Sequence, residues 1–411
     1  MRTILLSLAF LAVTAASAQK TYQNPVINRS LPDPTVLRVG KLYYLYSTED
    51  IRNTPIYVSR NLVNWSYVGT CFTEETRPKM VPGGGIWAPD INKIGNRYVL
   101  YYSKSTWGGE WECGIGVAVS VSPRGPFTDK GKLFISSEIG VQNSIDPFYF
   151  EEEDGRKFLF WGSFRGIYGI ELSDDGLSIK EGAEKQQIAG TLTEGTCIYK
   201  HNGYYYLIGS AGSCCEGIKS TYRMVVARSE NLFGPYVNRA GQSAMNNNFV
   251  QLLNKSSKFV GVGHCSEVVQ DDAGQDWLLY HGYEVADPDG GRKVFLDKII
   301  WNESGWPTIK NRMPSETAEA PLIGEEADVE ELPAEAQGYD ISPRAVTDSF
   351  CIRALQEQAF SWQVVDLHGK VWKNGKAQKA VTVNTRDLPM GLYVVTLNSK
   401  QGQTSQKILR K

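Results

Sequence analysis

Five acidic residues occupy the same kind of position along the N-terminal two-thirds of the chain. Each precedes a short apolar run, a glycine-containing turn and a second, aromatic-rich run; the five are Asp33, Asp90, Asp146, Glu194 and Glu267. Carboxyl groups that converge in one cleft can do general acid and base chemistry, because one group donates a proton while another activates water. The pattern therefore predicts a site of several carboxylates, provided that the fold brings these acids together.

Each acid leads into a predicted β-hairpin. The turns contain Gly40, Gly95, Gly155, Gly203 and Gly274, and tight hairpin turns favour glycine because it adopts positive φ angles. A strand-and-turn unit that recurs about every 50 to 70 residues is typical of a β-propeller. We therefore expect an all-β fold, a five-bladed β-propeller followed by a small C-terminal β-sandwich-like domain, with the five acids at one mouth of the central channel.

Aromatic residues in the predicted loops could stack on the apolar faces of sugar rings. They include Trp87, Trp107, Trp111, Phe164 and Tyr168, whereas we expect the tyrosine-rich second strands of the hairpins to form the core. Paired carboxylates beside aromatic faces suit glycoside hydrolysis. In this reaction one carboxylic acid protonates the leaving oxygen, and one carboxylate activates water or attacks the sugar.

Composition and local signals divide the chain into four parts. Residues 1–18 are expected to be a signal peptide, because Arg2, an apolar run and Ala16-Ser17-Ala18 follow in that order. Residues 19–315 form the predicted propeller, residues 316–345 a linker rich in Glu, Ala and Pro, and residues 346–411 the β-sandwich domain. No later apolar run is long enough for a transmembrane helix, and a net charge of −2 gives no indication of nucleic-acid binding.

Seven cysteines follow no known metal or disulfide spacing. Most are expected to be small buried hydrophobic residues. The adjacent Cys214 and Cys215 are either a disulfide at a binding loop or two thiols.

The predicted propeller resembles glycoside hydrolase family 43, especially its arabinanase and arabinofuranosidase branches. The resemblance rests on Leu31-Pro32-Asp33-Pro34, Trp87-Ala88-Pro89-Asp90, Ser144-Ile145-Asp146-Pro147, Glu194-Gly195-Thr196, Ser213-Cys214-Cys215-Glu216-Gly217 and Gly263-His264, which occur in this order. It implies an inverting hydrolase with three carboxylates: Asp33 as general base, Glu194 as general acid, and Asp146 as the residue that orients Glu194 and raises its pKa.

Other residues are expected to bind substrate or metal. Trp87, Trp107, Phe164, Cys214, Cys215 and Arg223 are candidates for substrate binding, and Asp90 either binds sugar hydroxyls or caps a strand. The resemblance implies that His264 binds a largely hydrated Ca²⁺ on the propeller axis; Val262 and Cys265 depart from the family's usual neighbours of this motif. No organic cofactor is expected.

The last 55 or so residues resemble the C-terminal sorting domain of the type IX secretion system. The matching segments are Val365–Lys370, Leu388–Tyr393 and Lys407–Lys411; a carbohydrate-binding or immunoglobulin-like module is the competing interpretation. The resemblance implies export by a dedicated machinery and a secreted or cell-surface location.

The sequence thus predicts a secreted enzyme that cleaves α-L-arabinofuranosyl linkages of plant polysaccharide, with arabinan endo-1,5-α-L-arabinanase as the preferred activity. The alternatives are an exo-α-L-arabinofuranosidase or a β-xylosidase that acts on arabinoxylan, and a non-catalytic carbohydrate-binding propeller. Loss of Asp33, Asp146 or Glu194 would have favoured the binding protein, but all three are present.

Overall fold

The computed structural model describes residues 20–324, 339–342, 345–354, 359–366, 370–399 and 402–411. The predicted signal peptide lies outside the described residues. The described chain divides into two compact units at Ile323/Gly324, and each unit is almost entirely β-structure. None of its described helices is long and apolar enough to cross a membrane.

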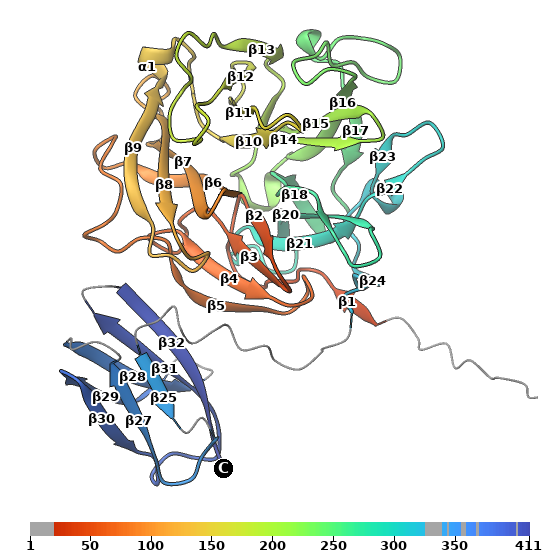
Figure 1. Cartoon of the computed structure of the whole chain (residues 1–411). Helices are drawn as coiled ribbons and strands as arrows, with labels where there is room; N and C mark the ends of the chain where they lie inside the picture. The colour runs from red at the N-terminus through yellow and green to blue at the C-terminus, as the bar shows by residue number, and fades with distance from the viewer. Residues whose placement is uncertain (1–19, 325–338, 343–344, 355–358, 367–369, 400–401) are drawn as a thin grey trace, which may run out of the picture. The chain divides into compact units, whose positions relative to one another are not determined.

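The first unit contains five four-stranded sheets that follow one another along the chain (Figure 1). The first two are β2 (Thr35–Val39), β3 (Leu42–Tyr46), β4 (Pro55–Ser59) and β5 (Trp65–Thr70), then β6 (Gly85–Ile94), β7 (Arg97–Ser105), β8 (Gly114–Ser120) and β9 (Thr128–Ile135). The third and fourth are β10 (Phe148–Glu151), β11 (Lys157–Trp161), β12 (Ile167–Glu171) and β13 (Gln186–Ala189), then β14 (Thr193–His201), β15 (Tyr204–Ala211), β16 (Arg223–Ser229) and β17 (Val250–Leu253).

In the fifth sheet, β20 (Asp276–Glu284) lies between β21 (Lys293–Lys298) and a first strand that is interrupted into β18 (Phe259–Gly263) and β19 (Val269–Gln270). All five predicted hairpins are therefore present. Figure 1 shows the sheets around a common centre, with β2, β6, β10, β14 and β18 nearest to it. The one short α-helix among the described residues, α1 (Ser136–Ile139), follows β9.

The start of the first unit is joined to its end. β1 (Thr21–Gln23) pairs with β24 (Thr317–Glu319), and the Asn24 side chain exchanges hydrogen bonds with the backbone of Leu296 in β21. The predicted linker therefore begins too early at residue 316, because β24 belongs to the first unit. Two short strands, β22 (Ile300–Trp301) and β23 (Pro307–Thr308), form a separate pair before β24.

The core of this unit consists of aromatic and aliphatic residues packed between neighbouring sheets. The second strands of the hairpins carry its largest fully buried side chains, including Tyr44, Tyr101, Trp161, Tyr206 and Tyr280. Burial of one such side chain is worth about 1.5–3 kcal/mol, so these strands hold the five sheets together. The prediction that the tyrosine-rich strands form the core is confirmed.

The second unit has two sheets. Strands β25 (Tyr339–Ser342), β27 (Ser349–Ala354) and β30 (Ala380–Asn384) form one, and β26 (Ala345–Val346), β32 (Gly402–Arg410), β31 (Gly391–Ser399), β28 (Phe360–Asp366) and β29 (Val371–Ala377) form the other. Residues of both sheets share one apolar cluster. β25 lies inside the predicted linker, most of which lies outside the described residues.

Candidate active site

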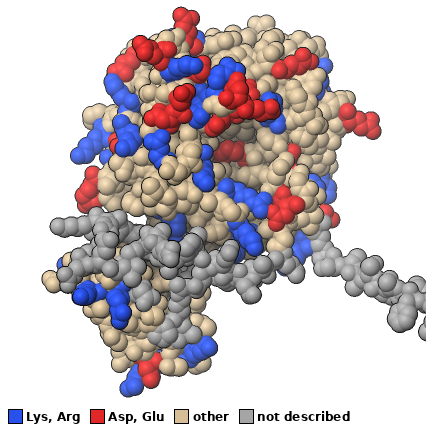
Figure 2. Space-filling model, in the orientation of Figure 1, with Lys and Arg blue, Asp and Glu red and all other residues tan. Residues whose placement is uncertain are grey.

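Asp33, Asp146 and Glu194 line one pocket of about 350 Å³. Asp33 and Asp146 lie two residues before β2 and β10, and Glu194 is the second residue of β14. Figure 2 shows acidic atoms inside a hollow near the centre of the first unit. All three side chains are buried, with no more than 8% of each residue exposed, so their charges interact with little screening by solvent.

Each of the five sheets has a residue with a positive φ angle in or beside its first strand, and we call this residue the corner of the sheet. Asp33, Ala88, Asp146, Gly195 and His264 all have positive φ angles, between 36° and 61°. Non-glycine residues rarely adopt this conformation, and it concentrates at functional sites. At Gly195 (φ 61°), a Cβ atom would lie 3.0 Å from the His264 ring, so glycine is required there on two grounds.

This corner explains why the five acids are not equivalent. The residues that share the corner are Asp33, Ala88, Asp146, Gly195 and His264, so the expectation that five acids converge at the same position was wrong for Asp90 and Glu267. Asp90 lies two residues beyond its corner; it is 2% exposed and accepts hydrogen bonds from the Tyr149 amide and the Asn92 side chain. Glu267 accepts hydrogen bonds from Thr35 Oγ1 and the Val36 amide instead.

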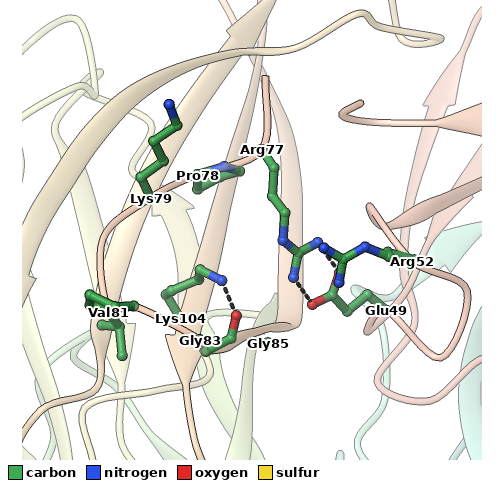
Figure 3. Close-up of a pocket in the computed structure, with 11 residues that line it drawn as sticks. Glu49, Arg52, Arg77, Pro78, Lys79, Val81, Gly83, Gly85 and Lys104 are labelled. Atoms are coloured by element: carbon green, nitrogen blue, oxygen red, sulfur yellow. Dashed lines mark hydrogen bonds and ion pairs between the residues drawn. The ribbon is translucent and has the colours of Figure 1, made fainter. Parts of the chain in front are cut away.

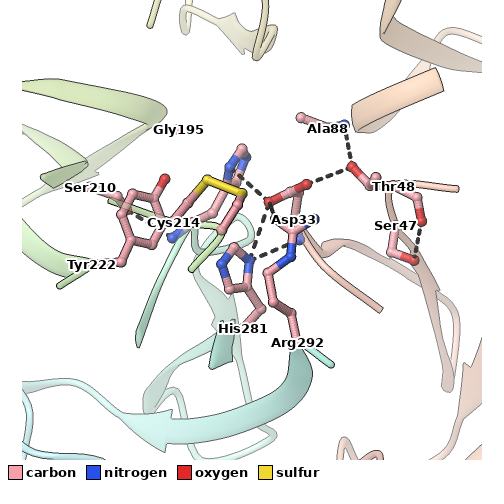
Figure 4. A network of polar contacts seen from close by, with 12 residues as sticks. Asp33, Ser47, Thr48, Ala88, Gly195, Ser210, Cys214, Tyr222, His281 and Arg292 are labelled. Atoms are coloured by element: carbon pink, nitrogen blue, oxygen red, sulfur yellow. Dashed lines mark hydrogen bonds and ion pairs between the residues drawn. A yellow bond between two sulfur atoms is a disulfide. The ribbon is translucent and has the colours of Figure 1, made fainter. Parts of the chain in front are cut away.

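Asp33 has polar partners at both carboxylate oxygens and at its backbone amide, which donates to His281 Nδ1 at 3.1 Å (Figure 4). Thr48 Oγ1 donates to Asp33 Oδ2 at 2.6 Å. Asp33 Oδ1 lies 3.3 Å from His264 Nδ1, 3.2 Å from His281 Nδ1 and 3.4 Å from Arg292 Nη1. Burial alone would raise the pKa of Asp33, but the charge of Arg292 and the contacts with His264 and His281 outweigh it and hold that pKa well below its usual value.

Arg292 is the fixed positive charge among these partners. Burial lowers the pKa of His281 to about 4 and also lowers the pKa of His264, so both rings are neutral near pH 7. The side chain of Arg292 is itself 16% exposed. Asp33 is thus an ionised carboxylate that a guanidinium stabilises.

Glu194 and Asp146 form a second, more protonated group. Ser163 Oγ donates to Glu194 Oε2 at 2.5 Å and Tyr222 Oη donates to Glu194 Oε1 at 2.9 Å, while the Gly195 amide donates to Asp146 Oδ2 at 3.1 Å. Burial raises the pKa of Asp146 well above its usual value, and the charge of Glu194 raises it further. Burial also raises the pKa of Glu194, and the charge of Asp33 adds to the rise. The hydrogen bonds from Ser163 and Tyr222 lower this pKa but do not outweigh burial.

The three carboxyl groups in the pocket therefore differ in their protonation. One is held ionised and two retain a proton more readily than ordinary carboxyls, which is the pattern of a paired general base and general acid. A site of this kind can protonate a leaving oxygen and activate water in one step.

Most of the predicted substrate-binding residues lie in the same pocket. Trp87, Trp107, Phe164, Cys214 and Cys215 line it. Trp87 and Trp107 have ring centroids 5.5 Å apart, and Trp107 is 79% exposed. Cys214 and Cys215 form a disulfide, which decides between the two alternatives left by the sequence.

The structure does not bring every predicted residue to the pocket. Asp90 is buried, and neither it nor Arg223, the first residue of β16, is among the lining residues. Of the other described cysteines, Cys71, Cys113, Cys197 and Cys265 are buried free thiols and Cys351 is partly exposed, as expected for small hydrophobic residues.

His264 lines the pocket, with Nδ1 toward Asp33. The described residues contain no group of three His, Cys, Asp or Glu side chains that could hold a metal ion. The side chains therefore do not fit a cation held mainly by protein ligands, and any ion here would depend on water for most of its shell.

Sequence reasoning missed several residues that contact the three acids: Thr48, Ser163, Tyr222, His281 and Arg292. His281 is fully buried on β20, and its ring stacks on Tyr222 at a centroid distance of 5.6 Å. No spacing or motif marks these residues, because His281 and Asp33 are 248 positions apart in the chain.

Comparison with known proteins agrees with this geometry. The model of glycosyl hydrolases family 43 matches residues 22–307. The chain belongs to this family. It is 34% identical over 305 residues to an extracellular exo-α-(1→5)-L-arabinofuranosidase of Cellvibrio japonicus, covering 68% of this chain and 86% of the relative. It is 31% identical to an extracellular endo-α-(1→5)-L-arabinanase of Bacillus subtilis, covering 74% and 94%.

Solved structures give the same result. The fold is similar to that of Cellvibrio cellulosa α-L-arabinanase complexed with arabinohexaose, with a TM-score of 0.63, 32% identity, and coverage of 68% of this chain and 95% of that one. It is also similar to Bacillus subtilis arabinanase, with a TM-score of 0.60, 28% identity, and coverage of 69% and 98%. This member of glycosyl hydrolase family 43 is a glycoside hydrolase.

The C-terminal resemblance is confirmed as well. Residues 341–411 match the secretion system C-terminal sorting domain. That domain marks the chain for a secretion system, so the enzyme is secreted or held at the cell surface.

Proposed function

We propose that this enzyme hydrolyses α-1,5-linked L-arabinofuranosyl residues within arabinan, by a single displacement with inversion at the anomeric carbon. The observation that carries the proposal is the split among three buried carboxyls in one pocket: the pKa of Asp33 is lowered, whereas those of Asp146 and Glu194 are raised. The relatives named for arabinan linkages support this substrate class.

Asp33 is the proposed general base. Its partners keep it ionised: Thr48 donates to Oδ2, Arg292 lies beside Oδ1, and the backbone amide of Asp33 donates to His281 Nδ1. An ionised carboxylate can accept a proton from water as that water attacks the sugar. An inverting mechanism needs the base and the acid about 6.5–9.5 Å apart, which residues on different sheets of the ring can provide.

Glu194 is the proposed general acid. Its raised pKa keeps a proton available for the leaving oxygen, and Ser163 and Tyr222 fix its orientation. Asp146 is the proposed positioning residue: it accepts from the amide of Gly195, next to Glu194. The two carboxyls interact, so the pair keeps its second proton to a higher pH than an isolated carboxyl would.

Two further assignments are inferred. We take the five sheets as the five blades of one propeller, and the two sheets of the second unit as a small β-sandwich that the export machinery recognises. The Trp87–Trp107 pair and the Cys214–Cys215 disulfide offer apolar surfaces for sugar rings on the pocket wall.

Calcium remains a proposal. His264 would be its single protein ligand, through Nε2, since Nδ1 faces Asp33. Such an ion would supply positive charge beneath the sugar, and no step above depends on it.

Product analysis on debranched arabinan tests the function, with wild type and Glu194→Ala side by side. We expect wild type to release a series of short oligosaccharides and the variant to release none. Arabinose as the sole product would identify an exo-acting enzyme, and activity on β-xylosides alone would identify a xylosidase. If wild type released nothing from arabinan, arabinoxylan or aryl glycosides, the non-catalytic binding propeller would replace the proposal.

A further inference from the structure

The first unit contains a second cavity, of about 510 Å³ (Figure 3). Its polar lining is four basic side chains and one acidic one: Arg52, Arg77, Lys79, Lys104 and Glu49. Gly83, Gly84 and Gly85 form part of the wall, so the backbone lies close to the space. Cavities of about 300–1,000 Å³ are typical of small-ligand sites, and this one carries an excess of positive charge.

Two of the basic residues have acidic partners. Arg77 forms a two-pronged ion pair with Glu49 and also donates to Asn53 Oδ1 at 3.0 Å. Arg52 pairs with Glu74 at the surface, at 2.5 and 2.7 Å. Lys79 is exposed and forms no ion pair with the described residues.

Lys104 is the unusual member. It is only 3% exposed, and its ammonium group donates to the carbonyl oxygen of Gly84. Within the described part of the chain, no carboxylate forms an ion pair with it. Burial lowers the pKa of Lys104 to about 8; the nearby charge of Arg77 adds to this effect, and the charge of Glu49 opposes it only in part. An ammonium has three hydrogens to donate and is costly to bury without an opposite charge, so an anion in the cavity would complete its environment.

The cavity and the catalytic pocket share a wall. Lys104 faces the cavity and its neighbour Ser105 faces the pocket, because successive side chains of a strand point to opposite sides. Likewise, Glu49 lies in the cavity while Thr48 and Asp50 line the pocket, and Gly85 precedes Trp87 by two residues. The cavity and the pocket are therefore separated by the segments that carry these residues, which places the cavity beside the pocket.

We propose that this cavity binds the carboxylate of a uronic acid residue carried by the polysaccharide, next to the linkage that is cleaved. This inference rests on the proposed function, since the sugar polymer delivers the anion. Arg52 and Arg77 are already paired with Glu74 and Glu49, so the ammonium groups of Lys104 and Lys79 are the donors for the carboxylate. The enzyme would thereby prefer arabinan attached to, or mixed with, acidic sugars.

Binding of sodium D-galacturonate by the full chain, measured by isothermal titration calorimetry at low salt, tests this. D-galactose, the methyl ester of galacturonate and inorganic phosphate are the comparison probes. We expect wild type to bind galacturonate and to bind the uncharged sugars at least tenfold more weakly. Lys104→Met should weaken galacturonate binding at least fivefold, while Lys93→Met, an exposed lysine of the same sheet, should leave it unchanged.

Lys79→Ala keeps the test valid if Lys104→Met does not fold, because Lys79 is exposed; we expect about threefold weaker binding. Equal affinity for galacturonate and its methyl ester would overturn the proposal, as would phosphate binding as tightly as galacturonate. Unchanged binding in both cavity variants would place the site elsewhere. Arabinan hydrolysis by wild type without uronate tests the proposed function separately: activity without galacturonate binding removes only this inference.

Discussion

Replacing Arg292 by methionine should shift the pH profile of the enzyme upward. Arg292 is the first charge that lowers the pKa of Asp33, and the two neutral histidines cannot replace it. Without the guanidinium, the pKa of Asp33 rises, so the base is lost to protonation at a higher pH. The acidic limb of kcat/KM, which reports the free enzyme, should therefore move to higher pH.

The size of the shift follows from the geometry. The atoms Arg292 Nη1 and Asp33 Oδ1 are 3.4 Å apart, for which Coulomb's law gives about 5 kcal/mol at an effective dielectric constant of about 20 and about 1 kcal/mol in bulk water. Since one pKa unit corresponds to about 1.4 kcal/mol, the acidic limb should rise by between about 1 and 3.5 units. The alkaline limb should rise less, because the charge of Arg292 is a smaller influence on Glu194.

The assay is the release of reducing sugar from linear arabinan between pH 3 and pH 9, for wild type, Arg292→Met and Arg292→Lys. The lysine variant keeps the charge and should show a smaller shift, and melting temperatures check that each variant is folded. An acidic limb that stays in place in Arg292→Met would refute the electrostatic role assigned to this residue and, with it, the reason why Asp33 is ionised.

Three further predictions concern other parts of the molecule. Asp146 and Glu194 titrate as a pair, in which the charge left by loss of the first proton holds the second; Asp146→Asn removes that effect, so the alkaline limb of the same profile should move to lower pH, and an unmoved limb would mean that burial and the charge of Asp33 are enough to raise the pKa of Glu194. Deletion of residues 324–411 should leave kcat/KM on arabinan within about twofold, because the first unit has its own cores, and a folded but inactive truncation would assign the C-terminal unit a role in catalysis. Treatment with EDTA should lower activity, and Ca²⁺ should restore it, if His264 holds an ion; unchanged activity after chelation would remove calcium from the account.

The sequence was sufficient for the hairpins and for three of the acids. Each turn glycine lies between two apolar runs whose pairing is local, so alternation and turn chemistry predict the pair, as in β2 and β3 around Gly40. Asp33, Asp146 and Glu194 could be found because they lie at the start of such units. Their assigned roles came from the family resemblance, since spacing alone does not tell a base from an acid.

The position of each acid relative to the positive-φ corner of its sheet could not be predicted in the same way. A corner with positive φ can be formed by Asp33, by Ala88 or by Gly195, so the position of an acid relative to its corner is not visible in the pattern. Asp90 therefore looked equivalent to Asp33 although it lies two residues further on. The hydrogen bond between Asp33 and His281 joins residues 248 positions apart, and only the closed ring of sheets brings them together.

In the proposed mechanism, Asp33 and Glu194 catalyse a single displacement at an arabinofuranosyl carbon. Proton nuclear magnetic resonance of the first product formed from α-1,5-linked arabino-oligosaccharides, recorded before the anomers equilibrate, tests it most directly. We expect the β-anomer to appear first, and Asp33→Ala and Glu194→Ala to yield no product. First appearance of the α-anomer would mean a covalent intermediate and would contradict the assignment of Asp33 as a base.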